Sequence, residues 1–298
     1  MLDARKLFVV ARFELTEAIR SRLFAVAMSL YAVGAALGSY IFLKTMAAAE
    51  TAARHSLAAS MRIDESSLPQ DLVREKALPM FASLVEDEAI RGELLRMPPL
   101  CIFYGYMTLS LVAALVLIIS AGTIATDVAS GATRYALFRC DRLTWALGKL
   151  LGQEAVLAAG LLLGALVAGG VGLTCDPHFQ SDTWVWLLRT SFRAWLYANA
   201  YLGLFVGLSL MASSALQARA FALFCLIGLG IAHSIVTADW ANARLPGLRY
   251  VGMLFPNAHH QALWSPNWGT YLPSAIALFV IGGLGFGLGH RVFRGRDA

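Results

Sequence analysis

The sequence is short of charged residues. Only 14% of its 298 residues are Asp, Glu, Lys or Arg, whereas 58% are hydrophobic. Soluble domains usually carry about 25% charged residues, so this composition excludes an ordinary soluble globular protein. The mean hydropathy is correspondingly high, at +0.63. The composition therefore predicts an integral membrane protein.

Cysteine is scarce, and the common catalytic and metal-binding patterns are missing. The four cysteines are scattered, which does not support a metal–thiolate cluster. Cys101 and Cys175 can both lie outside the membrane, where a disulfide can form, but their spacing does not establish one. No G-x-S-x-G or H-E-x-x-H occurs, and the adjacent His259 and His260 would point about 100° apart on a helix. We predict no catalytic residue, metal or cofactor in this chain.

A nucleotide-binding loop is also missing. A P-loop needs the pattern G-x-x-x-x-G-K-[ST], because its backbone amides cradle phosphates and its hydroxyl binds magnesium. The Gly148-Lys149 pair is followed by Leu150 and has no glycine five residues before Gly148. Any nucleotide hydrolysis must therefore come from another polypeptide, and this chain is not expected to be an enzyme.

Long apolar runs are plentiful, and six of them approach the ~20 residues that cross a bilayer. They are rich in Leu, Ala, Val and Gly and do not alternate apolar with polar residues, which favours helices over a membrane β-barrel. We predict an all-α integral membrane protein, one transmembrane domain over 1–298, with six spans: Leu23–Leu43, Ile102–Thr123, Leu147–Leu173, Ala194–Ala212, Phe221–Thr237 and Leu272–His290.

Basic residues flank these spans on one side. With six spans, the N-terminus, the second connection, the fourth connection and the C-terminus all lie on the same side of the membrane, and the positive-inside rule makes that side cytoplasmic. Both termini are then inside. No basic patch with interleaved aromatic residues suggests nucleic acid binding. The basic residues are Arg5, Lys6, Arg12, Arg20, Arg22, Arg134, Arg139, Arg142, Lys149, Arg219, Arg291, Arg294 and Arg296.

The segment 47–99, between the first two spans, is long and its charges are balanced, so it is expected outside. It is rich in helix formers, Ser66 and Ser67 can cap a helix entered through Pro69, and Met97-Pro98-Pro99 stops the chain before the second span. We predict an external helical insertion of two or more helices. It either covers the outer ends of the bundle or is a platform for a substrate or partner.

The first 22 residues predict a polar helix that runs into the first span. Its apolar residues form two stripes, Phe8, Leu15 and Ile19 on one and Val9 and Phe13 on the other. We expect one stripe to meet lipid and the other to meet protein.

Three charged residues within or beside the spans stand apart from this pattern. Glu154 lies about two turns inside the third span, where an ionisable group is costly. It either has a structural role, such as pairing with an interfacial basic residue, or belongs to a transport pathway. Arg189 and Arg193 lie beside Trp184, Trp186 and Trp195, a composition typical of the outer membrane interface.

Glycines recur at helical spacing within the spans. The pairs Gly160/Gly164, Gly203/Gly207, Gly283/Gly287 and Gly285/Gly289 are each four residues apart, which allows close approach of two helices. Packing within the chain and pairing of two chains are equally compatible with them.

Two polar segments resemble ABC-2-type transporter permeases. The sequence ARFELTEAIRSRLF resembles the family's N-terminal connecting helix, an interfacial helix that touches the ATPase, and Glu14, Arg20 and Arg22 match it. The segment 126–146 and the start of the third span resemble the family's cytoplasmic coupling loop. Asp127 replaces the more usual Glu, and Arg139-Cys140 stands where a Pro is common. The matching positions are Asp127, Gly131, Thr133, Tyr135–Phe138, Arg142, Gly148 and Lys149.

The coupling segment also suits this role physically. A motor that closes two cytosolic domains needs a short polar helix of the membrane part to sit in a cleft of each. Arg134, Arg139 and Arg142 can pair with carboxylates of such a partner, while Tyr135, Leu137 and Phe138 can fill a pocket. The alternative is a solvated loop whose charges only set topology.

A third, weaker resemblance concerns PGLRYVGMLFPNAHHQALWSPNWGTYLP, which is similar to the external elements before the last span of NosY-like ABC-2 permeases. The family resemblance implies a multi-pass permease of the bacterial inner membrane that exports its substrate. Its implied partners are an ATPase subunit holding ATP and Mg²⁺, a second copy or related chain, the lipid bilayer and an external accessory protein.

Two other classes remain open. A secondary transporter would show interrupted helices and internal repeats, and an integral membrane enzyme would need a coherent catalytic set within the bilayer. The sequence does not indicate the substrate.

Overall fold

The computed structural model describes residues 3–64, 67–69, 72, 88–177, 179–238 and 247–295. All regular elements in this part of the chain are helices. Six of them are long and apolar enough to cross a membrane. The prediction of an all-α integral membrane protein with six spanning helices is therefore confirmed.

In chain order the helices are α1 (Ala4–Arg20), α2 (Arg22–Met61), α5 (Glu88–Arg96), α6 (Pro99–Ser120), α7 (Thr123–Ser130), α8 (Ala132–Leu137), α9 (Arg142–Cys175), α10 (Ser181–Met211), α11 (Ala215–Thr237), α13 (Leu248–Gly252), the 3-10 turns η2 (Pro256–His259) and η3 (Ala262–Trp264), and α14 (Trp268–Arg294).

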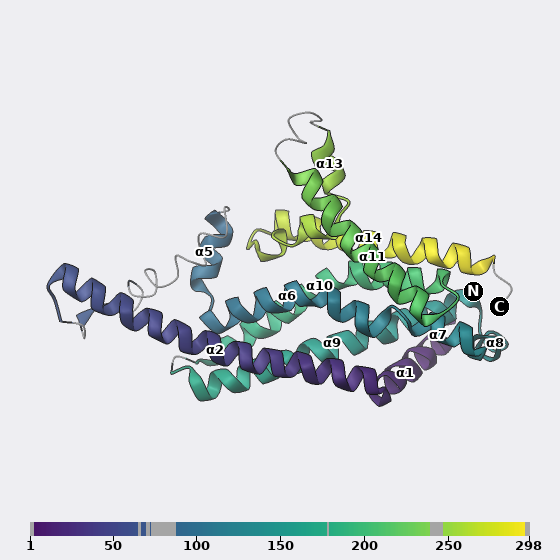
Figure 1. The fold of residues 1–298 in the computed structure, drawn as a ribbon, viewed down its shortest axis with the longest axis horizontal. Helices are drawn as coiled ribbons and strands as arrows, with labels where there is room; N and C mark the ends of the chain where they lie inside the picture. The colour runs from purple at the N-terminus through teal and green to yellow at the C-terminus, as the bar shows by residue number, and fades with distance from the viewer. Residues whose placement is uncertain are drawn as a thin grey trace.

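The long helices run side by side, and the molecule has two distinct ends (Figure 1). One end carries both chain termini together with α1, α7 and α8, and we call it the termini end. The other carries α5 and the far part of α2, and we call it the α5 end. Each end contains one cluster of buried charges, described below.

Helix α10 is the centre of the bundle, because 78% of its most apolar 18-residue stretch is buried. Its Gly203 and Gly207 pack directly on the backbone of α14 at Gly282 and Gly285, where a Cβ atom would overlap the facing backbone. Contact this close requires glycine on both helices. The Gly203/Gly207 and Gly285/Gly289 pairs therefore pack helices within the chain.

The remaining glycine pairs differ from each other. Gly160 and Gly164 of α9 face Met28 and Tyr31 of α2, so they too serve internal packing. Gly283 and Gly287 of α14 have open space where a Cβ would stand.

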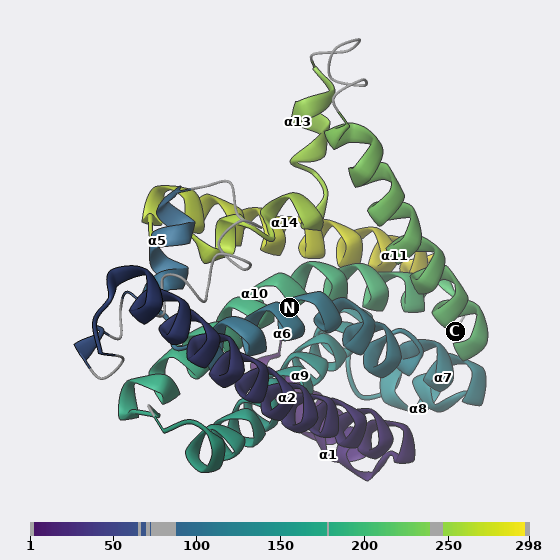
Figure 2. The same ribbon diagram turned by 60° about the vertical axis from the view of Figure 1, so that its left-hand side comes forward.

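Helix α11 leans away from the other long helices in both views (Figures 1 and 2). Only 11% of its most apolar window is buried, and it exposes large apolar side chains such as Leu216 and Phe224. Within a bilayer these side chains would contact lipid or another chain.

Two spanning helices, α2 and α10, extend furthest beyond their predicted spans. The first span continues as one helix to Met61, about 60 Å at 1.5 Å per residue, so the start of segment 47–99 extends the spanning helix. The helix expected after Ser66 and Ser67 lies largely outside the described residues, and α5 is described near the end of the segment. The fourth spanning helix begins at Ser181 rather than Ala194, because its polar first turns are still helical.

Candidate functional site

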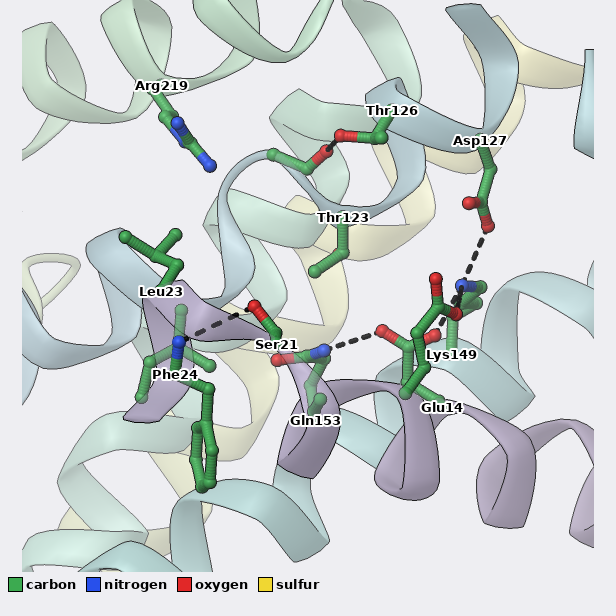
Figure 3. Close-up of a pocket in the computed structure, with 14 residues that line it drawn as sticks. Glu14, Ser21, Leu23, Phe24, Thr123, Thr126, Asp127, Lys149, Gln153 and Arg219 are labelled. Atoms are coloured by element: carbon green, nitrogen blue, oxygen red, sulfur yellow. Dashed lines mark hydrogen bonds and ion pairs between the residues drawn. The ribbon is translucent and has the colours of Figure 1, made fainter. Parts of the chain in front are cut away.

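Lys149 is the centre of a buried ion cluster at the termini end (Figure 3). Its ammonium Nζ contacts the Glu14 carboxylate, lies 2.7 Å from Asp127 Oδ2, and lies 4.0 Å from Glu17 Oε2. Lys149 and Glu14 are only 4% and 3% exposed. One lysine therefore joins three elements, α1, α7 and α9, at a place where water competes little for its charge.

Gln153 extends the network by one turn of α9. Its side-chain Nε2 donates to Glu14 Oε1 over 2.6 Å, and its Oε1 accepts a hydrogen bond from Ser120 Oγ over 3.2 Å. Ser120 is the last residue of α6. The polar network thus connects the N-terminal helix to the end of the second spanning helix.

The sequence makes this contact possible through two glycines of α9. A Cβ at Gly148 would lie 2.7 Å from Val10 Cβ, and a Cβ at Gly152 would lie 2.5 Å from Glu14 Cβ. Because both positions lack a side chain, α1 lies directly against α9 and Glu14 reaches Lys149.

The face of α1 that meets protein is neither predicted apolar stripe. Phe8, Val9, Phe13 and Ile19 are all at least half exposed. The contact is made instead by Val10 and Glu14, which lie one turn apart on the face between the stripes. Neither predicted stripe provides the contact with α9, because Gly148 and Gly152 of α9 face Val10 and Glu14.

A cavity of about 170 Å³ adjoins the cluster. Lys149 and Glu14 form one wall, and Arg219 of α11 lies across the cavity from them, beyond Thr123 and Thr126 (Figure 3). The junction between α1 and α2 at Ser21 also lines it. Residues from six helices, α1, α2, α6, α7, α9 and α11, therefore line this one cavity.

Glu17 adds a third carboxylate to a cluster in which Glu14 and Asp127 already outnumber the Lys149 ammonium. Burial raises the pKa of its carboxyl above the ordinary value, Lys149 opposes this rise, and the Asp127 and Glu14 carboxylates add to it. Its side chain is still 56% exposed, so water screens part of these interactions.

The predicted coupling helix is present as α8. Gly131 separates it from α7 with a left-handed φ of 74°, a conformation that glycine adopts readily. Tyr135 and Phe138 are 78% and 87% exposed, and Arg134 and Arg139 are exposed beside them. We call Arg134, Tyr135, Phe138 and Arg139 the α8 surface. Leu137, predicted as a third anchor, instead packs partly against the core.

Arg142 contacts the C-terminal helix. Its Nη1 donates to the backbone carbonyls of Phe293 and Arg294, over 2.8 and 3.0 Å, and the guanidinium lies 5.5 Å from the Phe293 ring centre. These carbonyls belong to the last turn of α14, which lacks intrahelical donors. Arg142 therefore holds the C-terminal helix onto the start of α9.

The other predicted residues lie apart from Lys149. Arg20 and Arg22 are exposed on either side of Ser21, where α1 ends and α2 begins. Glu154 points to Trp195 of α10, and within the described residues its buried Oε2 atom has no hydrogen-bond partner. The basic partner considered for Glu154 does not appear there.

The two arginines of α10 differ in exposure. Arg189 is partly exposed and lies 5.0 Å from the Trp186 ring centre. Arg193 is only 1% exposed, because α10 begins earlier than predicted and carries this residue into the bundle.

The described residues contain neither a candidate metal site nor the Cys101–Cys175 disulfide. In the described part of the chain, no three His, Cys, Asp or Glu side chains gather where they could hold a metal ion. Cys175 is a free thiol, so the disulfide with Cys101 is not formed.

The sequence was then compared with known proteins. A family model described as ABC-2 family transporter protein matches residues 8–248. The matched range includes most of α1, the Lys149 cluster and all of α8. The chain matches no curated protein sequence.

Proposed function

Since this chain belongs to the ABC-2 family of transporter proteins and has the character of an ABC transporter permease, we propose that it exports its substrate with energy from a separate ATPase subunit. That subunit would bind ATP and Mg²⁺ and would contact the permease at the α8 surface and along α1.

One observation carries this proposal: an exposed aromatic and basic helix is directly connected to a buried ion cluster. Tyr135 and Phe138 are among the most exposed large side chains of the protein, and large exposed aromatic residues beside arginines are typical of binding anchors. Asp127 lies on α7, which joins α8 through Gly131 alone.

The cluster provides a route for movement. A displacement of α8 would move α7 and Asp127, and through Lys149 it would move Glu14 on α1 and the start of α9. Ion pairs in a buried setting resist separation more strongly than exposed ones. Asp127, Lys149 and Glu14 are therefore proposed to transmit movement within the permease, while Arg134, Tyr135, Phe138 and Arg139 contact the ATPase.

The proposed orientation places the termini end in the cytoplasm of a bacterial cell, at the inner membrane. The basic α8 surface, Arg20 and Arg22 all lie at this end, as the positive-inside rule requires of a cytoplasmic face. The α5 end would then be outside.

A second copy or a related chain is proposed to complete the transporter, because closing two ATPase domains requires two permease surfaces. The poor burial of α11 and the open Gly283/Gly287 face of α14 support contact with another chain in the membrane.

The NosY-like subtype is also part of the proposal. The segment before α14 folds into α13, η2 and η3. The Tyr197 hydroxyl of α10 donates to Asn257 Oδ1 over 2.9 Å, and Tyr201 donates to the same oxygen. This supports a structured element at the end of the bundle, as the resemblance implies, and an external accessory protein would have access to it.

The proposal is tested by purifying the tagged protein from its native membrane in mild detergent and assaying ATP hydrolysis in the eluate. We expect an ATP-hydrolysing subunit to co-elute. A Tyr135→Ala/Phe138→Ala variant should lose at least about tenfold of that activity, since removing two anchors of ≥2 kcal/mol each weakens binding at least this much. Tyr250→Ala is the matched control, because Tyr250 is 72% exposed but outside the proposed contact.

Two outcomes would contradict the proposal. If no ATP-hydrolysing subunit co-elutes with the wild type, a secondary transporter or a membrane enzyme becomes the better explanation. If the ATPase is retained by the α8 variant as well as by Tyr250→Ala, the coupling surface lies elsewhere.

A further inference from the structure

The α5 end contains a second buried ion cluster, and its charges are not balanced. Glu93 of α5 is 9% exposed, and its Oε1 lies 3.0 Å from Arg189 Nη1 and 3.7 Å from Arg193 Nη2. Two guanidinium groups of α10 therefore share one carboxylate oxygen. The three side chains together carry one excess positive charge.

Arg193 is poorly satisfied. It is 1% exposed, and in the described part of the chain none of its guanidinium nitrogens makes a hydrogen bond. Its distance to Glu93 exceeds the ~2.8 Å of a good charge-assisted bond. A guanidinium has five N–H donors, and burying donors that have no hydrogen-bond acceptor costs free energy. The unmet donors leave Arg193 with the capacity to bind a further anion.

An aromatic ring also lies beside Arg193. The Trp264 ring centre lies 5.7 Å from the guanidinium carbon, and Trp264 in turn packs directly on Gly105 of α6. Arg189 is partly exposed, at 45% of its side chain. A charged path thus leads from the surface at Arg189, past Glu93, to Arg193 inside the bundle.

The carboxylate that occupies this position belongs to a separate element. Helix α5 is the nine-residue end of segment 47–99, and its Ile90 and Leu94 hold it against the bundle. A fixed ion pair would be expected to use both carboxylate oxygens on one arginine. A carboxylate that shares one oxygen between two arginines is more easily replaced.

We propose that Arg189 and Arg193 form a binding site for an oxyanion, a carboxylate or phosphate group, and that Glu93 occupies this site until such a ligand displaces it. Displacement would release α5 from the bundle. That the oxyanion belongs to a transported solute rests on the proposed function, whereas the binding itself does not. Under the proposed topology the site is at the outer end of the bundle.

The test uses the purified full-length protein in detergent, with sodium acetate and sodium phosphate as probes and sodium chloride at equal ionic strength as reference. In Glu93→Gln the competing carboxylate is gone. Acetate or phosphate should then raise the unfolding temperature saturably, by about 2–5 °C at a tenfold excess over its dissociation constant. The matched Glu93→Gln/Arg193→Met variant should not respond.

A second measurement covers the case in which Glu93→Gln does not fold. In the wild type, displacement of Glu93 should increase trypsin cleavage after Arg96 when acetate or phosphate replaces chloride, and Arg193→Met should remove this increase. The site is refuted if neither variant pair shows an anion response that depends on Arg193.

A third measurement distinguishes the source of the oxyanion. Micelles containing phosphatidic acid are compared with soluble phosphate at equal total phosphate. A response to the soluble anion indicates a free solute, and a response only to the lipid indicates a headgroup. An Arg193-dependent response in a protein that co-purifies with no ATPase would retain the site and remove its assignment to transport.

Discussion

The two ends of the bundle each bury a cation, but they satisfy it differently. At the termini end, Lys149 has two carboxylates in direct contact and a third at 4.0 Å. At the α5 end, Arg193 has one carboxylate at 3.7 Å, which it shares with Arg189. A cation with ample partners holds elements together, whereas a cation with too few partners retains attraction for another anion.

The difference also follows the connectivity. The Lys149 partners come from α1 and α7, so the cluster joins the N-terminal helix to the segment that precedes α8. The Arg193 partner comes from α5, at the end of a long segment between two spanning helices. The first arrangement suits transmission of movement, and the second suits exchange.

The largest expected effect is that of Lys149→Met. It leaves the buried Glu14 and the Asp127 carboxylate without their cation, so we expect a loss of about 3–5 kcal/mol. The measurement is thermal unfolding of the purified protein in detergent. Lys44→Met is the control, because Lys44 is exposed. A loss no larger than that of the control would show that the cluster does not stabilise the termini end.

Gly152→Leu should have the next largest effect. Its side chain would collide with Glu14 and the Ala11 carbonyl, so α1 must move away from α9 at a cost of about 1–3 kcal/mol. Gly170→Leu, on the same helix, is the matched control because its position has open space. Unfolding temperatures and trypsin cleavage of the α1–α2 junction would report the effect. Equal stability of the two variants would contradict the close packing of α1.

Arg193→Met should sharpen the contrast with Lys149→Met. Glu93 keeps Arg189 at 3.0 Å, and a poorly satisfied buried guanidinium is replaced by an apolar side chain. We therefore expect a change below about 1 kcal/mol, in either direction, because replacing such a charge is often neutral or stabilising. Thermal unfolding beside Lys149→Met measures the difference. A loss as large as that of Lys149→Met would mean that the two clusters are equally structural.

The smallest expected effect is that of Glu17→Gln, and it depends on pH. The folded protein raises the pKa of Glu17 above 4.5, so the protonated form favours folding and that contribution is lost as pH rises through the folded pKa. The free energy of unfolding of Glu17→Gln should therefore rise relative to that of the wild type as pH increases. The expected difference is under about 1 kcal/mol, because the side chain is largely exposed. Unfolding temperatures between pH 4 and 8 test this. The opposite trend would contradict a raised pKa of Glu17 in the folded protein.

The sequence anticipated the membrane class and much of the termini end. Apolar length and composition predicted six spanning helices, and the family resemblance of the segment 126–146 implied the short helix that the structure contains as α8. Glu14, Asp127 and Lys149 were singled out together, but as contacts to a partner. Their burial against one another was not predicted, although Gly148 and Gly152 at helical spacing beside Lys149 were a usable signal of close helix contact.

What the sequence by itself determined is the set of properties that sum along a short stretch of chain: hydrophobic length, helix propensity and the side on which basic residues gather. Only the tertiary structure decided which helices are neighbours. Glu14 meets Lys149 and Glu93 meets Arg193 across long separations in sequence, and no local pattern encodes such pairings. The strength of a buried charge depends on these partners and on the exclusion of water, which exist only once the helices have packed.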